Sequence, residues 1–297
     1  ILNPKSNVQF GEGGAGAFSD GKLNTLVKDV KGRNHKVLQI FTSAGAPTEI
    51  LYENKPHIGT DVLVDVVANL RKEILRLGGE IYFSSEITDI FVKDEKIEAI
   101  EINHTKKVKT DLLILAIGHS ARDTFAMLKE KKLTMEAKAF AVGFRVEHPQ
   151  AMINKLQYKG ADMKYLPVAP YKITAQTSTG RGVYSFCMCP GGFVVNASSE
   201  ENRLAINGMS YYKRDSNNAN SAIIVSVTPD DFESKDALAG VVFQRKLEEK
   251  AYALCDGKIP QQLFLDYKEN RKTKEYGGFE SCVKGKTAFT NLRGLLS

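Results

Sequence analysis

The sequence has no tryptophan and few cysteines, which are Cys187, Cys189, Cys255 and Cys282. No two of them form a Cys-x-x-Cys pair and no histidine stands at zinc-ligand spacing, so we predict no metal site. Few cysteines and no secretion signal favour a reducing, cytoplasmic location. No apolar run approaches the length of a membrane span, so we expect no membrane-spanning segment.

The charge balance is mildly basic, with 41 Lys and Arg against 35 Asp and Glu, a formal net charge of +6. The lysines are scattered, and no basic stripe alternates with aromatic residues. The excess is therefore typical of a solvated surface, and we do not expect nucleic-acid binding. A length of 297 residues with 42% apolar content predicts two folded domains with sizeable cores.

The first 140 residues carry the pattern of an α/β domain. Apolar residues at helical spacing predict a helix over 61–77, which Gly78 and Gly79 end. A short strand is expected at 80–83, then a hairpin of strands 87–92 and 97–102. Residues 112–117 are apolar throughout, which is typical of a strand covered on both faces. Gly118 ends this run, and Ser120 begins a predicted helix through Leu128.

After about residue 140 the pattern changes to closely spaced strands. We expect strands at 140–146, 183–188, 193–197, 204–209 and 222–227, a tight turn at 190–192, and one long helix over 238–254. The sequence therefore predicts an α/β fold class that is α+β overall. Residues 1–140 would form one domain, and residues 141–297 a second, mainly antiparallel β domain.

Four glycines, at positions 11, 13, 14 and 16, formally match the pattern G-x-G-x-x-G. That pattern requires a strand before it and a helix directly after it, but turn chemistry follows at 18–22, so we reject the primary dinucleotide fingerprint. A phosphate loop ending at Lys22 is rejected too, because Leu23 stands where Ser or Thr must bind magnesium. Two interpretations remain: main-chain amides that cradle a phosphate or a flavin edge, or a flexible linker.

Three side chains are candidates for catalytic chemistry. Cys187 and Cys189 lie two residues apart on a predicted strand, so both sulfurs would face one side. They would form a redox pair or a reactive thiol near a flavin, or simply two small buried side chains. His119 would be a proton donor or a structural hydrogen bonder. Arg145 and His148 would bind an anionic substrate, or only add surface charge.

Four blocks of sequence resemble a bacterial family of uncharacterised FAD-dependent dehydrogenases. In family order they are NVQFGEGGAGAFSDGKL at 7–23, KPHIGTD at 55–61, LAIGHSARDTF at 115–125 and RGVYSFCMCPGG at 181–192. The resemblance implies a fold like that of glutathione-reductase-type flavoproteins, with a Rossmann-like FAD domain and an inserted substrate domain. It also implies an FAD-dependent oxidoreductase that transfers hydride to or from the flavin. NADH, NADPH or an organic small molecule would be the electron donor.

The resemblance also assigns roles to single residues. It implies that the flavin ring and pyrophosphate are lined by Gly11, Gly13, Gly14, Gly16, Ser19, Asp20, Gly21 and Lys22. The main chain of Ile87 would contact the adenine, and Ala116, Gly118 and His119 would line a returning strand near the cofactor. Residues 187–192 would face the ring, so His119, Cys187 and Cys189 are the catalytic candidates.

The resemblance further implies that a first βαβ unit would precede residue 1 and that a second flavin-binding segment would follow residue 297. Residues 1–140 would thus be a partial FAD-binding domain and residues 141–297 the middle or substrate domain. We expect weak or absent FAD binding by these residues alone, and self-association through uncovered sheet edges. The alternative is a non-catalytic flavin- or RNA-binding module. The basic pI of about 8.9 and the lack of a clear acid, base or nucleophile constellation favour it.

Overall fold

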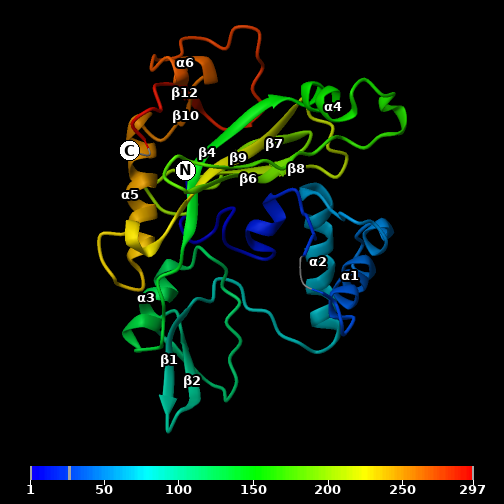
Figure 1. Cartoon of the computed structure of the whole chain (residues 1–297). Helices are drawn as coiled ribbons and strands as arrows, with labels where there is room; N and C mark the ends of the chain where they lie inside the picture. Colours follow the sequence, from blue (N-terminus) through cyan, green and yellow to red (C-terminus); the bar gives the residue numbers. More distant parts are fainter. Residues whose placement is uncertain (1, 26–27, 296–297) are drawn as a thin grey trace.

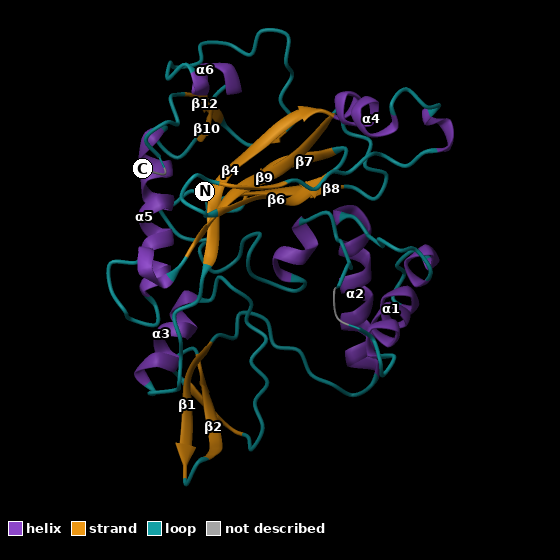
Figure 2. Cartoon of the chain, viewed as in Figure 1, coloured by secondary structure: helices purple, strands orange, loops and turns teal. Residues whose placement is uncertain are grey.

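The computed structural model describes residues 2–25 and 28–295. Figure 1 shows a central group of strands, with helices α1 and α2 near one side and a separate hairpin below. Figure 2 shows that helix and strand are mixed along the whole chain. The protein is therefore a mixed α/β molecule with several antiparallel sheets, as its sequence predicts.

Two helices and their connections form the first core. They are α1 (Arg33–Ser43) and α2 (Thr60–Arg76), preceded by the short 3-10 helices η1 (Gly14–Phe18) and η2 (Thr48–Leu51). The apolar face of α2 buries Val66 against a cluster that includes Leu38, Ile50 and Ile58. Asp61 in the first turn of α2 and Arg76 in the last complement the helix dipole. The predicted helix over 61–77 is confirmed.

The hairpin is also confirmed. Strands β1 (Ile87–Lys93) and β2 (Lys96–Ile102) pair antiparallel, and β3 (Lys106–Lys109) adds to β2. The turn residues Asp94 and Glu95 both have positive φ, 47° and 60°. This left-handed pair is the geometry that joins two strands through a two-residue turn.

Two predicted strands are wrong. Residues 80–83 and 112–117 form neither strand nor helix. Leu112 and Ile114, predicted to be buried on both faces, are 73% and 80% exposed. An apolar run becomes a buried strand only where neighbouring strands accept its hydrogen bonds, and no described segment pairs with 112–117. The predicted Rossmann-like parallel sheet is accordingly not formed by the described residues.

The second half forms an antiparallel sheet, a smaller mixed sheet in which β11 pairs with β7 in parallel, and the long predicted helix. The larger sheet has the order β4-β9-β6-β5 and the smaller one β11-β7-β8. Their strands are β4 (Phe140–Pro149), β5 (Thr174–Gln176), β6 (Gly182–Cys189), β7 (Gly192–Asn196), β8 (Ile206–Ser210), β9 (Asn218–Val227) and β11 (Val283–Lys284). All five strands predicted here are confirmed, as is the turn at 190–192.

Helices surround these sheets. They are α3 (Arg122–Glu130), α4 (Gln150–Tyr158), η3 (Met163–Tyr165), η4 (Pro229–Asp231), α5 (Ala239–Leu254) and α6 (Phe264–Lys268), with strands β10 (Ile259–Gln261) and β12 (Thr287–Phe289) pairing in parallel. The start of α5 packs Ala239 against Val227 of β9 and Phe232. In the described ranges, no helix is long and apolar enough to cross a membrane.

Candidate functional site

The glycine loop exposes bare main chain at its start. Gly11 and Gly16 have open space in front of them, since an added Cβ would touch nothing within 4 Å. Gly13 and Gly14 have φ values of 83° and 50°, a left-handed conformation that glycine adopts without steric cost. The loop ends in η1 rather than in an α-helix, which agrees with rejecting the dinucleotide fingerprint.

The end of the loop is fixed inside the protein. Asp20 is 1% exposed and accepts hydrogen bonds from Arg214, with the Nε–Oδ1 distance at 2.9 Å. Gly21 lies so close to the start of α2 that an added Cβ would stand 2.8 Å from the amide nitrogen of Gly59. The Oγ1 of Thr60 donates to the carbonyl of Ser19 at 2.7 Å. Asp20 and Gly21 therefore hold the loop against the rest of the fold.

The block at 55–61 completes this junction. His57 forms a β-bridge with Lys22, and its ring stacks on Tyr212 with centroids 5.4 Å apart. Asp61 accepts a 2.8 Å hydrogen bond from the amide of Tyr212. Gly59 is required here, because an added Cβ would approach the amide nitrogen of Tyr212 to 2.3 Å. The block thus joins α2 to the chain that follows β8.

Lys22 connects the loop to the predicted cysteine pair. Its Nζ lies 3.1 Å from the carboxylate of Asp20 and also donates to the main-chain carbonyl of Met188. Met188 stands between Cys187 and Cys189 in strand β6. The structure therefore brings Asp20 and Lys22 together with the two cysteines, across more than 160 residues of sequence.

The two cysteines lie on a β-bulge that the sequence did not predict. Phe186 pairs with Ala222 of β9, but Cys189 pairs with Asn220, so β6 holds one extra residue. Cys187 has a φ of 45°, a left-handed conformation that is strained for a residue with a Cβ. Bulges of this kind redirect a side chain, and strained residues often occur at functional sites.

The two thiols have opposite environments. Cys189 is fully buried, and its Sγ donates to the carbonyl of Cys187 at 3.4 Å. The neighbouring Cys189 thiol, whose effect outweighs that of burial, lowers the pKa of the Cys187 thiol to about 6, with help from the charges of Arg145 and Lys22. The interaction with Cys187 and burial raise the pKa of the Cys189 thiol. Cys187 is thus a thiolate at neutral pH while Cys189 keeps its proton.

Arg145 and Asn220 complete the surroundings of Cys187. Arg145 Nη1 donates to the carbonyl of Cys187 at 3.1 Å and to Asn220 Oδ1 at 2.6 Å. Asn220 is 0% exposed, and its Nδ2 has no hydrogen-bond partner. The expectation that Arg145 is only surface charge is therefore wrong. His148 is also partly buried, with its ring 5.3 Å from that of Tyr171, and burial lowers its pKa.

His119 lies elsewhere, on an exposed loop. Its Nδ1 is 3.0 Å from Ser120 Oγ, which donates to Gln9 Oε1 at 3.3 Å, just before the glycine loop. Ala116 and Gly118 lie on the same exposed loop rather than on the predicted returning strand, because the segment has no partner strand. No hydrogen bond or ion pair of the described residues joins His119 to the cysteines, so the three catalytic candidates form two groups.

Ile87 stands at the first position of β1, opposite Ile102. Its neighbour Glu86 forms an ion pair with Lys5, in which Oε2 lies 2.6 Å from Nζ. The residues from 5 to 9 thus run from the start of β1 towards Ser120. Three predicted cofactor segments, at Ile87, Gly118 and the glycine loop, are linked by this stretch of chain.

The glycine segments fit a dinucleotide cofactor at the level of the main chain. Such a cofactor needs amides that no side chain covers. Gly11, Gly16 and Gly118 meet this need, since each has open space where a Cβ would stand. Lys22 is engaged with Asp20 and Met188, so its charge serves the fold.

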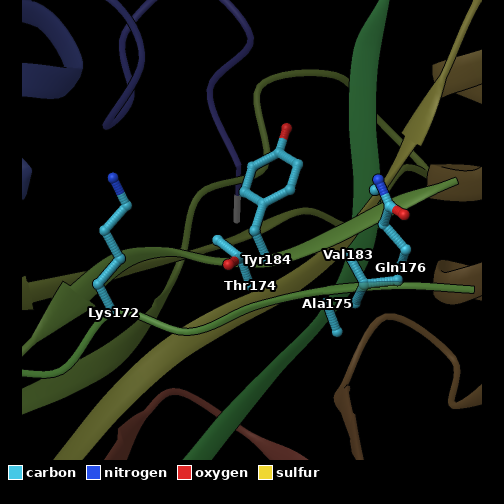
Figure 3. A pocket seen from close by; sticks show the side chains of 7 residues that line it. Lys172, Thr174, Ala175, Gln176, Val183 and Tyr184 are labelled. Atoms are coloured by element: carbon cyan, nitrogen blue, oxygen red, sulfur yellow. The ribbon is translucent and has the colours of Figure 1, made fainter.

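Two hollows lie on the second half of the molecule. An open one of about 650 Å³ lies at the β5–β6 edge, where Figure 3 shows Lys172, Thr174 and Tyr184 on its wall. It contains none of the predicted site residues. A smaller cavity of about 290 Å³ lies between β4 and α5 and includes Arg145 in its lining. Over the described ranges, no group of three or more His, Cys, Asp and Glu residues could hold a metal ion.

The sequence missed Arg214 and Asn220. Neither stands in a recognisable motif, and their partners Asp20 and Arg145 are 194 and 75 residues away. A single sequence shows the two residues of each pair but gives no sign that they are in contact.

Comparison with known proteins gives two findings. Residues 139–297 match a family model described as FAD-dependent protein, C-terminal domain-like. The chain is 52% identical over 280 residues to an uncharacterized protein of Clostridium beijerinckii (strain ATCC 51743 / NCIMB 8052). That alignment covers 93% of this chain and 52% of the relative, so the chain spans about half the relative's length. Because the model matches more than half of its residues, the chain belongs to this family of FAD-dependent proteins.

Proposed function

We propose that the protein is an FAD-dependent oxidoreductase that transfers hydride to or from the flavin. The observation that carries the proposal is the match of residues 139–297 to an FAD-dependent family. Bound FAD would supply a ring system that accepts and donates hydride, which no protein side chain provides. The substrate would be a small molecule.

Two parts of this chain would serve the cofactor. The open main chain of Gly11, Gly16 and Gly118 would approach the flavin or its pyrophosphate, as bare amides do in nucleotide sites. The Cys187 thiolate, beside Lys22 and Arg145, would face the reacting part of the substrate or ring. His119, on the exposed loop next to Ser120, would carry a proton.

The test is an absorbance spectrum of the purified full-length protein, recorded before and after anaerobic addition of NADH or NADPH. A flavin band that bleaches supports an oxidoreductase with a nicotinamide donor. A band that persists supports an organic donor instead. A preparation without flavin that cannot be reconstituted would overturn the proposal and favour a binding module.

A substitution tests the assigned cofactor backbone. Gly16→Leu places a side chain in open space at a residue without positive φ, so it disturbs the cofactor and not the fold. We expect the FAD affinity to fall at least roughly tenfold, about 1.4 kcal/mol. Gly278→Leu is the matched control, because Gly278 has the same open surroundings away from the loop. Equal FAD binding by both variants would remove the glycine loop from the cofactor site.

A further inference from the structure

The bulge in β6 draws together two cysteines that a regular strand would keep apart. At about 3.3 Å per residue, positions i and i+2 of a flat strand are separated by about 6.6 Å. A disulfide needs Cβ atoms only about 3.5–4.5 Å apart. The extra residue in β6 and the φ of 45° at Cys187 contract this segment, and the Sγ of Cys189 turns back to lie 3.4 Å from the carbonyl oxygen of Cys187.

The pair is asymmetric in the way that thiol–disulfide exchange requires. The attacking group must be a thiolate that is accessible, and the second thiol must wait beside it. Cys187 is partly exposed, whereas Cys189 is fully buried and donates to the carbonyl of Cys187. Access from solvent therefore selects Cys187 as the first sulfur to react.

The surroundings can stabilise negative charge on sulfur. Arg145 and Lys22 both lie at the bulge, since they donate to the carbonyls of Cys187 and Met188. Asn220 of β9 is the register partner of Cys189. Its side-chain Nδ2 is a buried donor that has no hydrogen-bond partner. An unpaired buried donor costs stability, and its N–H is free to donate to a charged or polar group at the bulge. Phe186, 60% exposed, offers an apolar contact beside Cys187.

We propose that Cys187 and Cys189 form a redox-active dithiol that reduces a disulfide substrate, with Cys187 as the nucleophile and Cys189 as the resolving thiol. The Cys187 thiolate attacks one substrate sulfur, so a mixed disulfide forms and the substrate S–S bond breaks. The first substrate thiolate leaves and takes a proton from water. Cys189 then loses its proton and attacks Cys187 Sγ, which forms the Cys187–Cys189 disulfide and releases the second thiolate with that proton.

Two electrons thus move from the dithiol to the substrate. Return of the Cys187–Cys189 disulfide to the dithiol needs two electrons and two protons. This step rests on the proposed function, because the reduced flavin would supply the electrons. The exchange step itself needs no flavin. It can therefore succeed or fail independently of the cofactor.

The experiment uses the full chain with Cys255→Ser and Cys282→Ser, so that only the pair reacts, and 2,2′-dithiodipyridine as the disulfide probe. We expect release of both pyridinethione groups, loss of two hydrogens in mass, and no adduct. Cys189→Ser should release one group and keep a stable pyridyl adduct. A native pair that stops at the adduct would overturn the resolving role.

Cys187→Ser should abolish the fast reaction. A thiol with a pKa of about 6 reacts at pH 6 roughly 20-fold faster than one near 9, once the larger thiolate fraction is set against its weaker nucleophilicity. If Cys187→Ser does not fold, as judged by thermal unfolding, the pH profile of the native pair decides. A half-maximal rate near pH 6 supports the proposal, and one near pH 9 overturns it.

The two proposals have distinguishable failures. A protein without a flavin band that still closes the Cys187–Cys189 disulfide would retain the dithiol and lose the oxidoreductase cofactor. A yellow protein whose cysteines react slowly and separately would keep the flavin function and exclude the dithiol from it.

Discussion

Arg122 shows how much one side chain in a recognised block can do for the fold. It is 8% exposed and donates to both oxygens of Glu248, at 2.7 and 3.0 Å, and to Glu200. Arg245 donates to the other oxygen of Glu200 at 2.5 Å. This network joins the start of α3 to α5. Removing one member would leave the remaining charges shielded from water without enough opposite charge to offset their lost hydration.

Glu200 gives the network a predictable pH dependence. Partial burial would raise its pKa, but hydrogen bonds from Arg245 and Arg122 outweigh that effect and lower it to about 2. A lowered pKa contributes stability that is complete above about 4.5 and is lost as pH falls toward 2. We expect Glu200→Gln to cost about 1–2 kcal/mol at pH 7, after allowance for solvent screening, and almost nothing near pH 2.

Urea unfolding at several pH values measures this difference. Glu233→Gln is the control, because Glu233 forms an exposed pair with Lys246 and its side chain is 74% exposed. A constant difference between the native protein and Glu200→Gln from pH 7 to pH 2 would contradict the assigned role of the carboxylate.

At the same scale, the sequence could name single site residues but not their partners. The Cys187–Cys189 pair followed from its spacing, whereas its contact depends on a bulge that only pairing with β9 creates. Asp20 and Lys22 were assigned to the flavin by resemblance. The structure shows them in contact with Arg214 and Met188, residues that no local pattern connects to the loop.

At the scale of elements, short sequence patterns predict the helices and turns whose formation depends on residues only a few positions apart. Helices α2 and α5 and the β1–β2 hairpin follow from apolar spacing and turn residues within a few positions. Residues 112–117 failed because a strand also needs a neighbour, which the segment itself cannot specify. An apolar run alone therefore does not decide whether its residues are buried.

Two isoleucines test that distinction with the same substitution. Ile114 is 80% exposed on the unpaired segment, and Ile58 is 0% exposed in the α1–α2 core. We expect Ile58→Ala to lower the free energy of unfolding by about 2–5 kcal/mol. Ile114→Ala should change it by less than about 0.5 kcal/mol. Urea denaturation of the 297-residue chain measures both, and a large loss for Ile114→Ala would show that residues 112–117 are buried in solution.

At the scale of the whole molecule, polar contacts join the α1–α2 region to the sheets. Figure 1 shows this region beside the strands rather than merged with them, and its apolar cluster is separate from those around β4 and β9. The connection runs through the Asp20–Arg214 pair and the contacts of Lys22, His57 and Asp61 described above. The predicted flavin loop lies at this junction, so its order depends on the polar contacts.

Arg214→Ala should therefore loosen one part of the molecule before the other. It leaves the Asp20 carboxylate buried with Lys22 as its remaining charged partner among the described residues. Such a loss of one member of a buried pair costs about 3 kcal/mol. We expect faster amide hydrogen exchange in α2 and the glycine loop, with β9 protected as in the native protein. Arg181→Ala, which breaks the more exposed pair with Asp231, is the control and should leave α2 unchanged. Equal loss of protection in α2 and β9 would mean that the two regions unfold as one unit. A loss confined to α2 and the loop would mean instead that the Asp20–Arg214 pair sets how firmly the loop is held beside Cys187.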